Sequence, residues 1–168
     1  MGVSAPSSQQ GPARLHVALV APEIHWNAGN AGRTCLAVDA DLHLVGPLGF
    51  SLEDKHLKRA GLDYWPRVRV TVWADWASFA AALPSLGAPV FFTARAPRRY
   101  DELEYPRSTV LVFGSESTGL PQALLEAEQS RTARIPMHDQ QLRSLNLSTS
   151  VAVAAYEVRR QWWRAGLP

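Results

Sequence analysis

Short apolar runs alternate along the chain with segments in which apolar positions recur at helical spacing. The runs that we interpret as strands are Leu15–Val20, Leu42–Val45, Val68–Trp73, Pro89–Thr93, Thr109–Phe113 and Thr132–Ile135. Several of them are almost continuously apolar, which is typical of strands covered on both faces in a parallel sheet. The pattern therefore predicts an α/β domain with a mostly parallel sheet flanked by helices.

Helical patterns fill the segments between these strands. The predicted helices are Gly29–Ala40, a segment that follows Ser51 and stops before Gly61, a segment capped by Asp75 that runs through Leu83, a helix opened by Pro121, and Leu147–Trp163. The last helix is the longest, and one stripe of it carries Val151, Ala154, Ala155, Val158 and Trp162. We expect this stripe to pack in the core, and a dimer interface is the alternative.

The first residues of the chain differ in composition from the rest. Residues 1–14 are rich in Ser, Pro, Gln and Gly, so they cannot contribute to a core and are predicted to form a disordered tail. Residues 15–168 are then expected to form a single domain, because 168 residues that are 46% hydrophobic fit one domain of ordinary size.

The composition also excludes several classes of protein. A single cysteine, Cys35, rules out an intramolecular disulfide and argues against a structural metal site. No apolar stretch approaches the length of a membrane span, and the N-terminus lacks the plan of a signal peptide. We therefore expect a cytoplasmic protein with no membrane segment and no metal. The formal net charge of +2 permits nucleic-acid binding without requiring it.

Three polar loops follow predicted strands at their carboxyl ends, where open α/β sheets bind ligands. They are Asn27–Arg33, Phe113–Pro121 and Ile135–Met137 with its continuation Arg143–Ser148. No G-x-G-x-x-G follows the first strand and no P-loop sequence occurs, which disfavours a dehydrogenase or a P-loop enzyme. Taken singly, the polar residues of these loops are also explained as helix caps, and the glycines as turn residues.

Taken together and in this order, the three loops resemble the motifs of the SPOUT class, the S-adenosylmethionine-dependent RNA methyltransferases with a deep trefoil knot. The resemblance spans about Leu15 to Gln161. The runs at 21–24 (APEI), 47–50 (PLGF), 57–64 (LKRAGLDY) and 143–148 (RSLNLS) are similar to the small TrmL (YibK-like) group of that class. Enzymes of that group methylate the ribose 2′-hydroxyl at the wobble position of tRNA. His25 and Trp26 depart from the group, which usually has small residues or proline there.

The resemblance implies a fold, a cofactor and a set of site residues. It implies a deep trefoil knot in the C-terminal part of the domain, with S-adenosyl-L-methionine bound in it. The implied cofactor-binding residues are Phe92, Gly114, Ile135, Ser144 and Leu145, and the implied catalytic residues are Arg33, Asn27, Glu116 and Asn146. Arg33 matches the arginine that acts on the 2′-hydroxyl in the family. Because a guanidinium stays protonated at ordinary pH, we favour a role in stabilising charge or holding a phosphate over a role as base.

The implied partner is tRNA, and a basic stretch is the candidate RNA-binding surface. Its candidate residues are Lys55, Lys58, Arg59 and Arg67. Tyr64 and Trp65 lie among them, and such a mixture of cations and aromatic rings suits phosphates and stacked bases, although a solvated helix face is the alternative. The resemblance further implies a homodimer in which one subunit reads the RNA whose ribose the other methylates.

Two other functions stay open from the sequence. One is a 2′-O-methyltransferase of the same class that acts on rRNA or on another tRNA position. The other is a non-catalytic RNA-binding module that has kept the scaffold. A panel of RNA substrates separates the first, and a measurement of S-adenosylmethionine binding separates the second.

Overall fold

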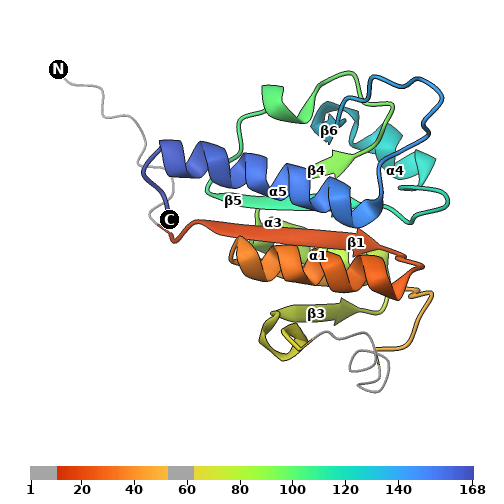
Figure 1. Ribbon diagram of the computed structural model, residues 1–168, viewed down its shortest axis with the longest axis horizontal. Coiled ribbons are helices and arrows are strands. Elements are labelled where there is room, and N and C mark those ends of the chain that lie inside the picture. The colour runs from red at the N-terminus through yellow and green to blue at the C-terminus, as the bar shows by residue number, and fades with distance from the viewer. Residues whose placement is uncertain (1–10, 53–62) are drawn as a thin grey trace.

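The computed structural model describes residues 11–52 and 63–168, which form a central sheet between two layers of helices (Figure 1). The strands are β1 (Arg14–Val20), β2 (Ala40–Val45), β3 (Val70–Trp73), β4 (Ala88–Phe92), β5 (Ser108–Phe113) and β6 (Thr132–Ala133). They are ordered β3-β2-β1-β5-β4-β6, and every neighbouring pair runs parallel. The predicted fold class is confirmed, and the predicted strands are all present with ends shifted by at most two residues.

The helices pack on both faces of this sheet. They are α1 (His25–Ala37), α3 (Trp76–Leu86), α4 (Gln122–Ala127) and α5 (Leu147–Arg164). In Figure 1, the orange α1 and the blue α5 lie side by side in front of the sheet, and α3 lies behind it. The helix predicted after Ser51 falls mainly on residues outside the described ranges. The trefoil knot that the resemblance implies stays a prediction.

The core divides into two parts because side chains alternate along the central strand β1. Leu15, Val17 and Leu19 pack against the face covered by α1 and α5. Ala18 and Val20 point to the other face, where they meet Phe79 of α3. The apolar stripe of α5 is buried in the first part of the core, as predicted, and its members are Val151, Ala154, Ala155, Val158 and Trp162.

Helix α1 begins at His25, earlier than the predicted start at Gly29, and ends at Ala37. Its N-cap residue Ile24 makes no side-chain capping bond. Instead, the Glu116 carboxylate accepts the backbone N–H groups of Glu23 and Ile24, and a negative charge there also suits the helix dipole. The local sequence could not indicate this start, because the group that satisfies it lies 92 positions away from Ile24.

Other helix and strand ends follow local signals. The carboxylate of Asp75 caps α3 as predicted, accepting the Ser78 N–H at 2.8 Å. Pro121 occupies the N-cap position of α4, so that short helix starts one residue after it. Strand β1 starts at Arg14, whose N–H donates to the Arg107 carbonyl at 2.7 Å, so the strand takes up the last residue of the predicted tail.

Candidate active site

A cavity of about 650 Å³ opens at the carboxyl ends of β4, β5 and β6, beside the start of α1. Its walls come from the loop after β4, the loop after β5 and the segment before α5, together with Ile24 and Asn27. Strands β1 and β5 are neighbours, and the chain leaves them toward opposite edges of the sheet, which is where open α/β sheets form ligand crevices. The second and third polar loops singled out in the sequence therefore meet at one pocket, whereas the first, Asn27–Arg33, lies within helix α1 and contributes Asn27 to the lining.

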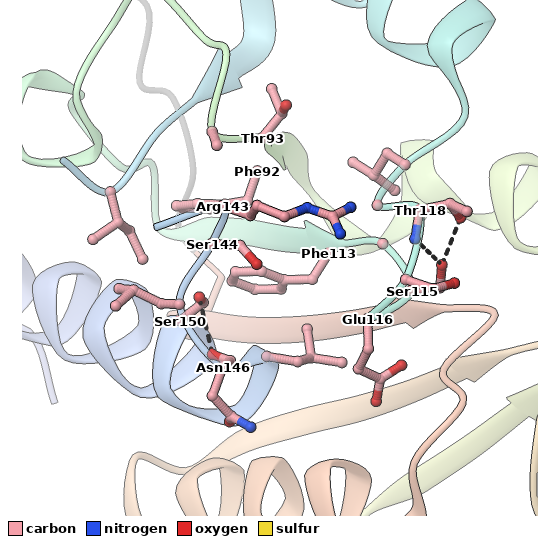
Figure 2. A pocket seen from close by; sticks show the side chains of 18 of the residues that line it. Phe92, Thr93, Phe113, Ser115, Glu116, Thr118, Arg143, Ser144, Asn146 and Ser150 are labelled. Atoms are coloured by element: carbon pink, nitrogen blue, oxygen red, sulfur yellow. Dashed lines mark hydrogen bonds between the residues drawn. The ribbon is translucent and has the colours of Figure 1, made fainter. Parts of the chain in front are cut away.

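A chain of side-chain hydrogen bonds ties these loops together. The amide of Asn146 donates to the Asn27 Oδ1 at 2.9 Å, and the amide of Asn27 donates to the Glu116 Oε1 at 2.9 Å. Asn146 also caps α5, because its Oδ1 accepts the N–H of Ser148 at 2.9 Å. In Figure 2, the side chains of Glu116 and Asn146 both point toward α1, away from the centre of the pocket. Three predicted catalytic residues thus contact one another and hold the loops in place.

The Glu116 carboxylate accepts three hydrogen bonds. Besides Asn27, it accepts the N–H of Glu23 at 2.7 Å and that of Ile24 at 3.2 Å. Partial burial acts to raise the pKa of the Glu116 carboxyl, but the hydrogen bonds from Asn27 and from backbone N–H groups outweigh it and hold the pKa below its usual value. Glu116 is therefore an ionised positioning group with few acceptor positions left for a proton from a substrate.

The loop after β5 is held in a tight shape by its own backbone. A Cβ on Gly114 would lie 2.0 Å from the Gly119 carbonyl carbon and 2.1 Å from the Leu120 nitrogen. The Ser115 and Thr118 hydroxyls are 2.8 Å apart, and the Ser117 hydroxyl donates to the Glu23 carboxylate. Only glycine fits at 114, because the backbone of Gly119 and Leu120 lies directly against it. The resemblance implies a cofactor-binding role for Gly114, and the structure gives this second reason for a glycine there.

The five predicted cofactor-binding residues all line the cavity: Phe92, Gly114, Ile135, Ser144 and Leu145. The rings of Phe92 and Phe113 stack with centroids 4.6 Å apart and an interplanar angle of 16°. Ile135 and Leu145 are half-buried beside them, whereas Ser144 is exposed. The pocket thus combines a flat aromatic and apolar wall with a polar rim, which fits a ligand that joins a purine to a charged tail.

Arg33 does not belong to the lining of this cavity. It is an exposed residue of α1, and its guanidinium carbon lies 5.3 Å from the centroid of the Tyr64 ring. Tyr64 itself is buried and donates its hydroxyl to the Gly29 carbonyl at 2.9 Å. The expectation that Tyr64 stacks on RNA bases is therefore wrong, because its ring belongs to the core.

The predicted RNA-binding residues are only partly described. Lys55, Lys58 and Arg59 lie outside the described residues. Arg67 is exposed at the end of a short 3-10 turn, Trp65–Arg67, and does not line the cavity. Its neighbour Arg69 is paired with Asp39 and Asp41, so that side chain is already committed.

Two cations also line the pocket, Arg95 after β4 and Arg143 directly before Ser144. Sequence reasoning assigned no role to Arg143. The position of Arg143 in the motif was the available signal. Within residues 11–52 and 63–168, no group of three or more His, Cys, Asp or Glu side chains is arranged to hold a metal ion. No helix in the same ranges is long and apolar enough to cross a membrane.

Solved structures similar to this fold include RNA methyltransferases. One is an AdoMet-bound rRNA methyltransferase from Sinorhizobium meliloti, with a TM-score of 0.78 and 26% identity, matched over 89% of this chain and 57% of that one. The chain itself belongs to the SpoU rRNA Methylase family, whose model matches residues 14–156.

Within that family, the chain is similar to proteins that act on one tRNA position. It is 45% identical to the tRNA (cytidine(34)-2′-O)-methyltransferase of Burkholderia cenocepacia over 149 residues, which cover 88% of this chain and 95% of that protein. A structure solved to explain 2′-OH methylation of C/U34 on tRNA has a TM-score of 0.82 and 46% identity, over 90% of this chain and 92% of the other.

Proposed function

We propose that this protein transfers a methyl group from S-adenosyl-L-methionine to the ribose 2′-hydroxyl of nucleotide 34, a cytidine or uridine, in tRNA. The observation that carries the proposal is the convergence of the three motif segments at one pocket through Asn27, Glu116 and Asn146. The similarity to a tRNA (cytidine(34)-2′-O)-methyltransferase, at 45% identity over 95% of that protein, supports the choice of substrate. Because the substrate tRNA is found in the cytoplasm, we propose that the protein acts in the cytoplasm.

The reaction is a displacement in which the bond from the methyl carbon to sulfur breaks as a bond to the 2′-oxygen forms, while the hydroxyl proton leaves. When bound, S-adenosyl-L-methionine supplies an electrophilic methyl group on a positively charged sulfur. The chain must hold the ribose in line with that methyl group and temper the charge on the oxygen. The hydrogen-bond network around Asn27 is suited to the first task, since it holds helix α1, the loop after β5 and the segment before α5 to one another.

The cofactor-binding residues are those that the family resemblance implies, and their place in the lining of the pocket supports them. We propose that the apolar wall of Phe92, Ile135 and Leu145 contacts the adenine, while Ser144 offers a hydroxyl to its polar edge or to the ribose. The stacked pair Phe92 and Phe113 supports this assignment, because a rigid aromatic wall suits a flat ring. We propose that Gly114, which also lines the pocket, contributes backbone groups to cofactor binding.

Arg33 is proposed to supply the guanidinium that stabilises the forming alkoxide or holds a phosphate next to it. Its exposed position outside the pocket of its own chain is consistent with a homodimer in which one subunit reads the RNA that the other methylates. The outward face of α5 supports pairing with a second copy, because Tyr156 and Trp163 are about half exposed there and contact each other edge to face. Large exposed aromatic side chains are enriched at such interfaces.

RNA binding beyond the pocket is proposed for the basic stretch of Lys55, Lys58, Arg59 and Arg67. The exposed position of Arg67 supports this role, and Arg69 is left out because its acidic partners occupy it.

The test is to incubate the full chain with radiolabelled S-adenosyl-L-methionine and, separately, unmodified tRNA and ribosomal RNA. The proposal expects label in tRNA and none above background in rRNA. Label in rRNA alone would favour the rRNA enzyme. No transfer to either RNA, together with no heat of cofactor binding in calorimetry, would favour a non-catalytic RNA-binding module.

A further inference from the structure

The pocket holds two arginine side chains whose charges are not balanced by any carboxylate in the described part of the chain. Arg95 and Arg143 both line the cavity. Several other arginines form ion pairs with carboxylates: Arg69 with Asp39 and Asp41, Arg99 with Asp101, Arg131 with Glu128, and Arg160 with Glu157. Arg95 and Arg143 are exposed. Their charges are therefore available to a ligand.

The direction of the Arg143 side chain adds to this observation. Figure 2 shows it extending from the segment before α5 across the pocket, with its guanidinium directed toward the loop that carries Ser115 and Thr118. Asn146 lies three residues after Arg143, and its hydrogen bonds to Asn27 and to the first turn of α5 hold it in place. The backbone that carries Arg143 is thus anchored close by, so the guanidinium is presented from a defined position.

The one acid among the described lining residues does not neutralise these arginines. Glu116 already accepts hydrogen bonds from Glu23, Ile24 and Asn27, and its side chain points toward α1. Two guanidinium groups in a cleft raise the local concentration of anions. The pocket is therefore prepared for a ligand with negative charge.

The charge of the candidate ligands decides which of them this arrangement suits. S-adenosyl-L-methionine carries a sulfonium, an ammonium and one carboxylate, so its net charge is positive and it does not call for two extra cations. An RNA substrate brings a phosphate beside every ribose. Arginine binds phosphate through two parallel N–H groups, which fixes orientation as well as position.

We propose that Arg143 holds a phosphate adjoining the target ribose and thereby positions the 2′-hydroxyl, with Arg95 as a second cation at the same pocket. This inference rests on the proposed function. Arg143 is a positioning residue, because it acts through the phosphate and not on the atoms that exchange the methyl group. It supplies a guanidinium inside the pocket, where Arg33 of the same chain does not reach the lining.

The experiment compares the full chain with Arg143→Ala, Arg143→Lys and the control Arg164→Ala. Arg164 is an exposed arginine at the far end of α5, roughly 25 Å along the helix from its start. For each protein, KM and kcat are measured with tRNA, S-adenosylhomocysteine affinity by calorimetry, and tRNA affinity as a function of salt. Arg143→Ala is expected to raise KM for tRNA roughly ten-fold or more. It should also reduce the salt slope, the steepness with which log tRNA affinity falls with log salt concentration, by about one. The affinity for S-adenosylhomocysteine should stay within about two-fold of the unaltered protein.

Arg143→Lys should restore the salt slope, because it keeps the charge, but recover KM only in part, because it loses the two-pronged contact. Arg164→Ala should match the unaltered protein. An unchanged KM and slope in Arg143→Ala would overturn the inference. So would weaker S-adenosylhomocysteine binding with an unchanged slope, which would assign Arg143 to the cofactor carboxylate. If the unaltered protein binds tRNA but transfers no methyl group, the proposed function fails, and the salt slope still decides the role of Arg143.

Discussion

Asn146 donates a hydrogen bond of 2.9 Å to Asn27, although the two residues are 119 positions apart in the chain. The contact joins the N-cap of α5 to the first turn of α1. Through Asn27 it extends to Glu116, so helix α1, the loop after β5 and the segment before α5 are linked by side chains and not only by the sheet beneath them. The pocket is therefore a preorganised site, and its links can be broken one at a time.

Asn146→Ala removes both the cap of α5 and the bond to Asn27. We expect the free energy of unfolding in urea to fall by about 1 to 2 kcal/mol, with a loss of methyl transfer to tRNA. Asn146→Asp keeps an acceptor for Ser148 and Thr149 but cannot donate to Asn27. It should retain most of the stability and still lose activity.

The matched control is Asp75→Ala, which removes the cap of α3 away from the pocket. It should cost a similar free energy and leave turnover unchanged. Full activity in Asn146→Asp would contradict the role that we give to the link between Asn146 and Asn27.

Gly114→Ala places a methyl group against the backbone of Gly119 and Leu120, at distances of 2.0 to 2.4 Å. Backbone cannot move aside as a flexible side chain can, so we expect a loss of more than about 3 kcal/mol in stability, or failure to fold. Gly119→Ala is the control, because a Cβ there would meet no atom within 4 Å. The remaining cost comes from the backbone, since φ at Gly119 is +71°. This substitution should cost only about 1 kcal/mol. Equal thermal unfolding of the two variants would refute the steric explanation.

A buried histidine pair makes the stability depend on pH. His16 Nδ1 and His43 Nε2 are 3.1 Å apart, and the Trp73 indole donates to the His43 Nδ1 at 3.0 Å. Burial, and next the neighbouring His16, lower the pKa of His43 from 6.5 to about 4, against a smaller opposing effect of Asp41. Burial also lowers the pKa of His16. Both rings are therefore neutral in the folded protein near neutral pH.

The unfolded chain takes up protons near pH 6.5, whereas folded His43 does so only near pH 4. Between these values the unfolded state binds more protons, so stability falls as pH falls. We expect the free energy of unfolding to be lower at pH 5.5 than at pH 7.5 by about 1 kcal/mol for His43, and a flatter profile for His43→Gln. Stability that stays level or rises on acidification through this window would count against the neutral pair.

Arg33→Ala tests the guanidinium assigned to catalysis. Cofactor affinity should stay within a few-fold, because Arg33 lies outside the pocket lining, while turnover on tRNA should fall roughly 100-fold or more. Loss of the contact with the Tyr64 ring should cost only about 0.5 to 1 kcal/mol, so misfolding does not explain the loss. Near-normal turnover would remove Arg33 from the reaction.

The sequence predicted what local patterning controls. Continuous apolar runs located the strands, and the small and apolar stripe of α5 identified its buried face, because burial on both sides of a sheet leaves a direct trace in composition. The Asp75 cap was also predictable from local sequence, because the donor Ser78 lies only three residues after the acceptor.

Features that depend on distant residues could not be predicted in this way. The start of α1 depends on Glu116, far along the chain, and Gly114 is required by a close approach of the backbone to itself. Tyr64 lies in a basic stretch, where an aromatic ring suggests base stacking, yet its hydroxyl donates a hydrogen bond to the Gly29 carbonyl and its ring is buried. The direction of the Arg143 side chain is likewise seen only in the folded structure (Figure 2).

The central claim is that the pocket directs a methyl group to one ribose oxygen of tRNA. It is tested most directly by locating the methyl group after reaction with unmodified tRNA and isotopically labelled S-adenosyl-L-methionine, by nuclease digestion and mass spectrometry. We predict the label on the 2′-oxygen of nucleotide 34. A label on a base, on a ribose elsewhere in the molecule, or on no nucleotide at all would contradict the account.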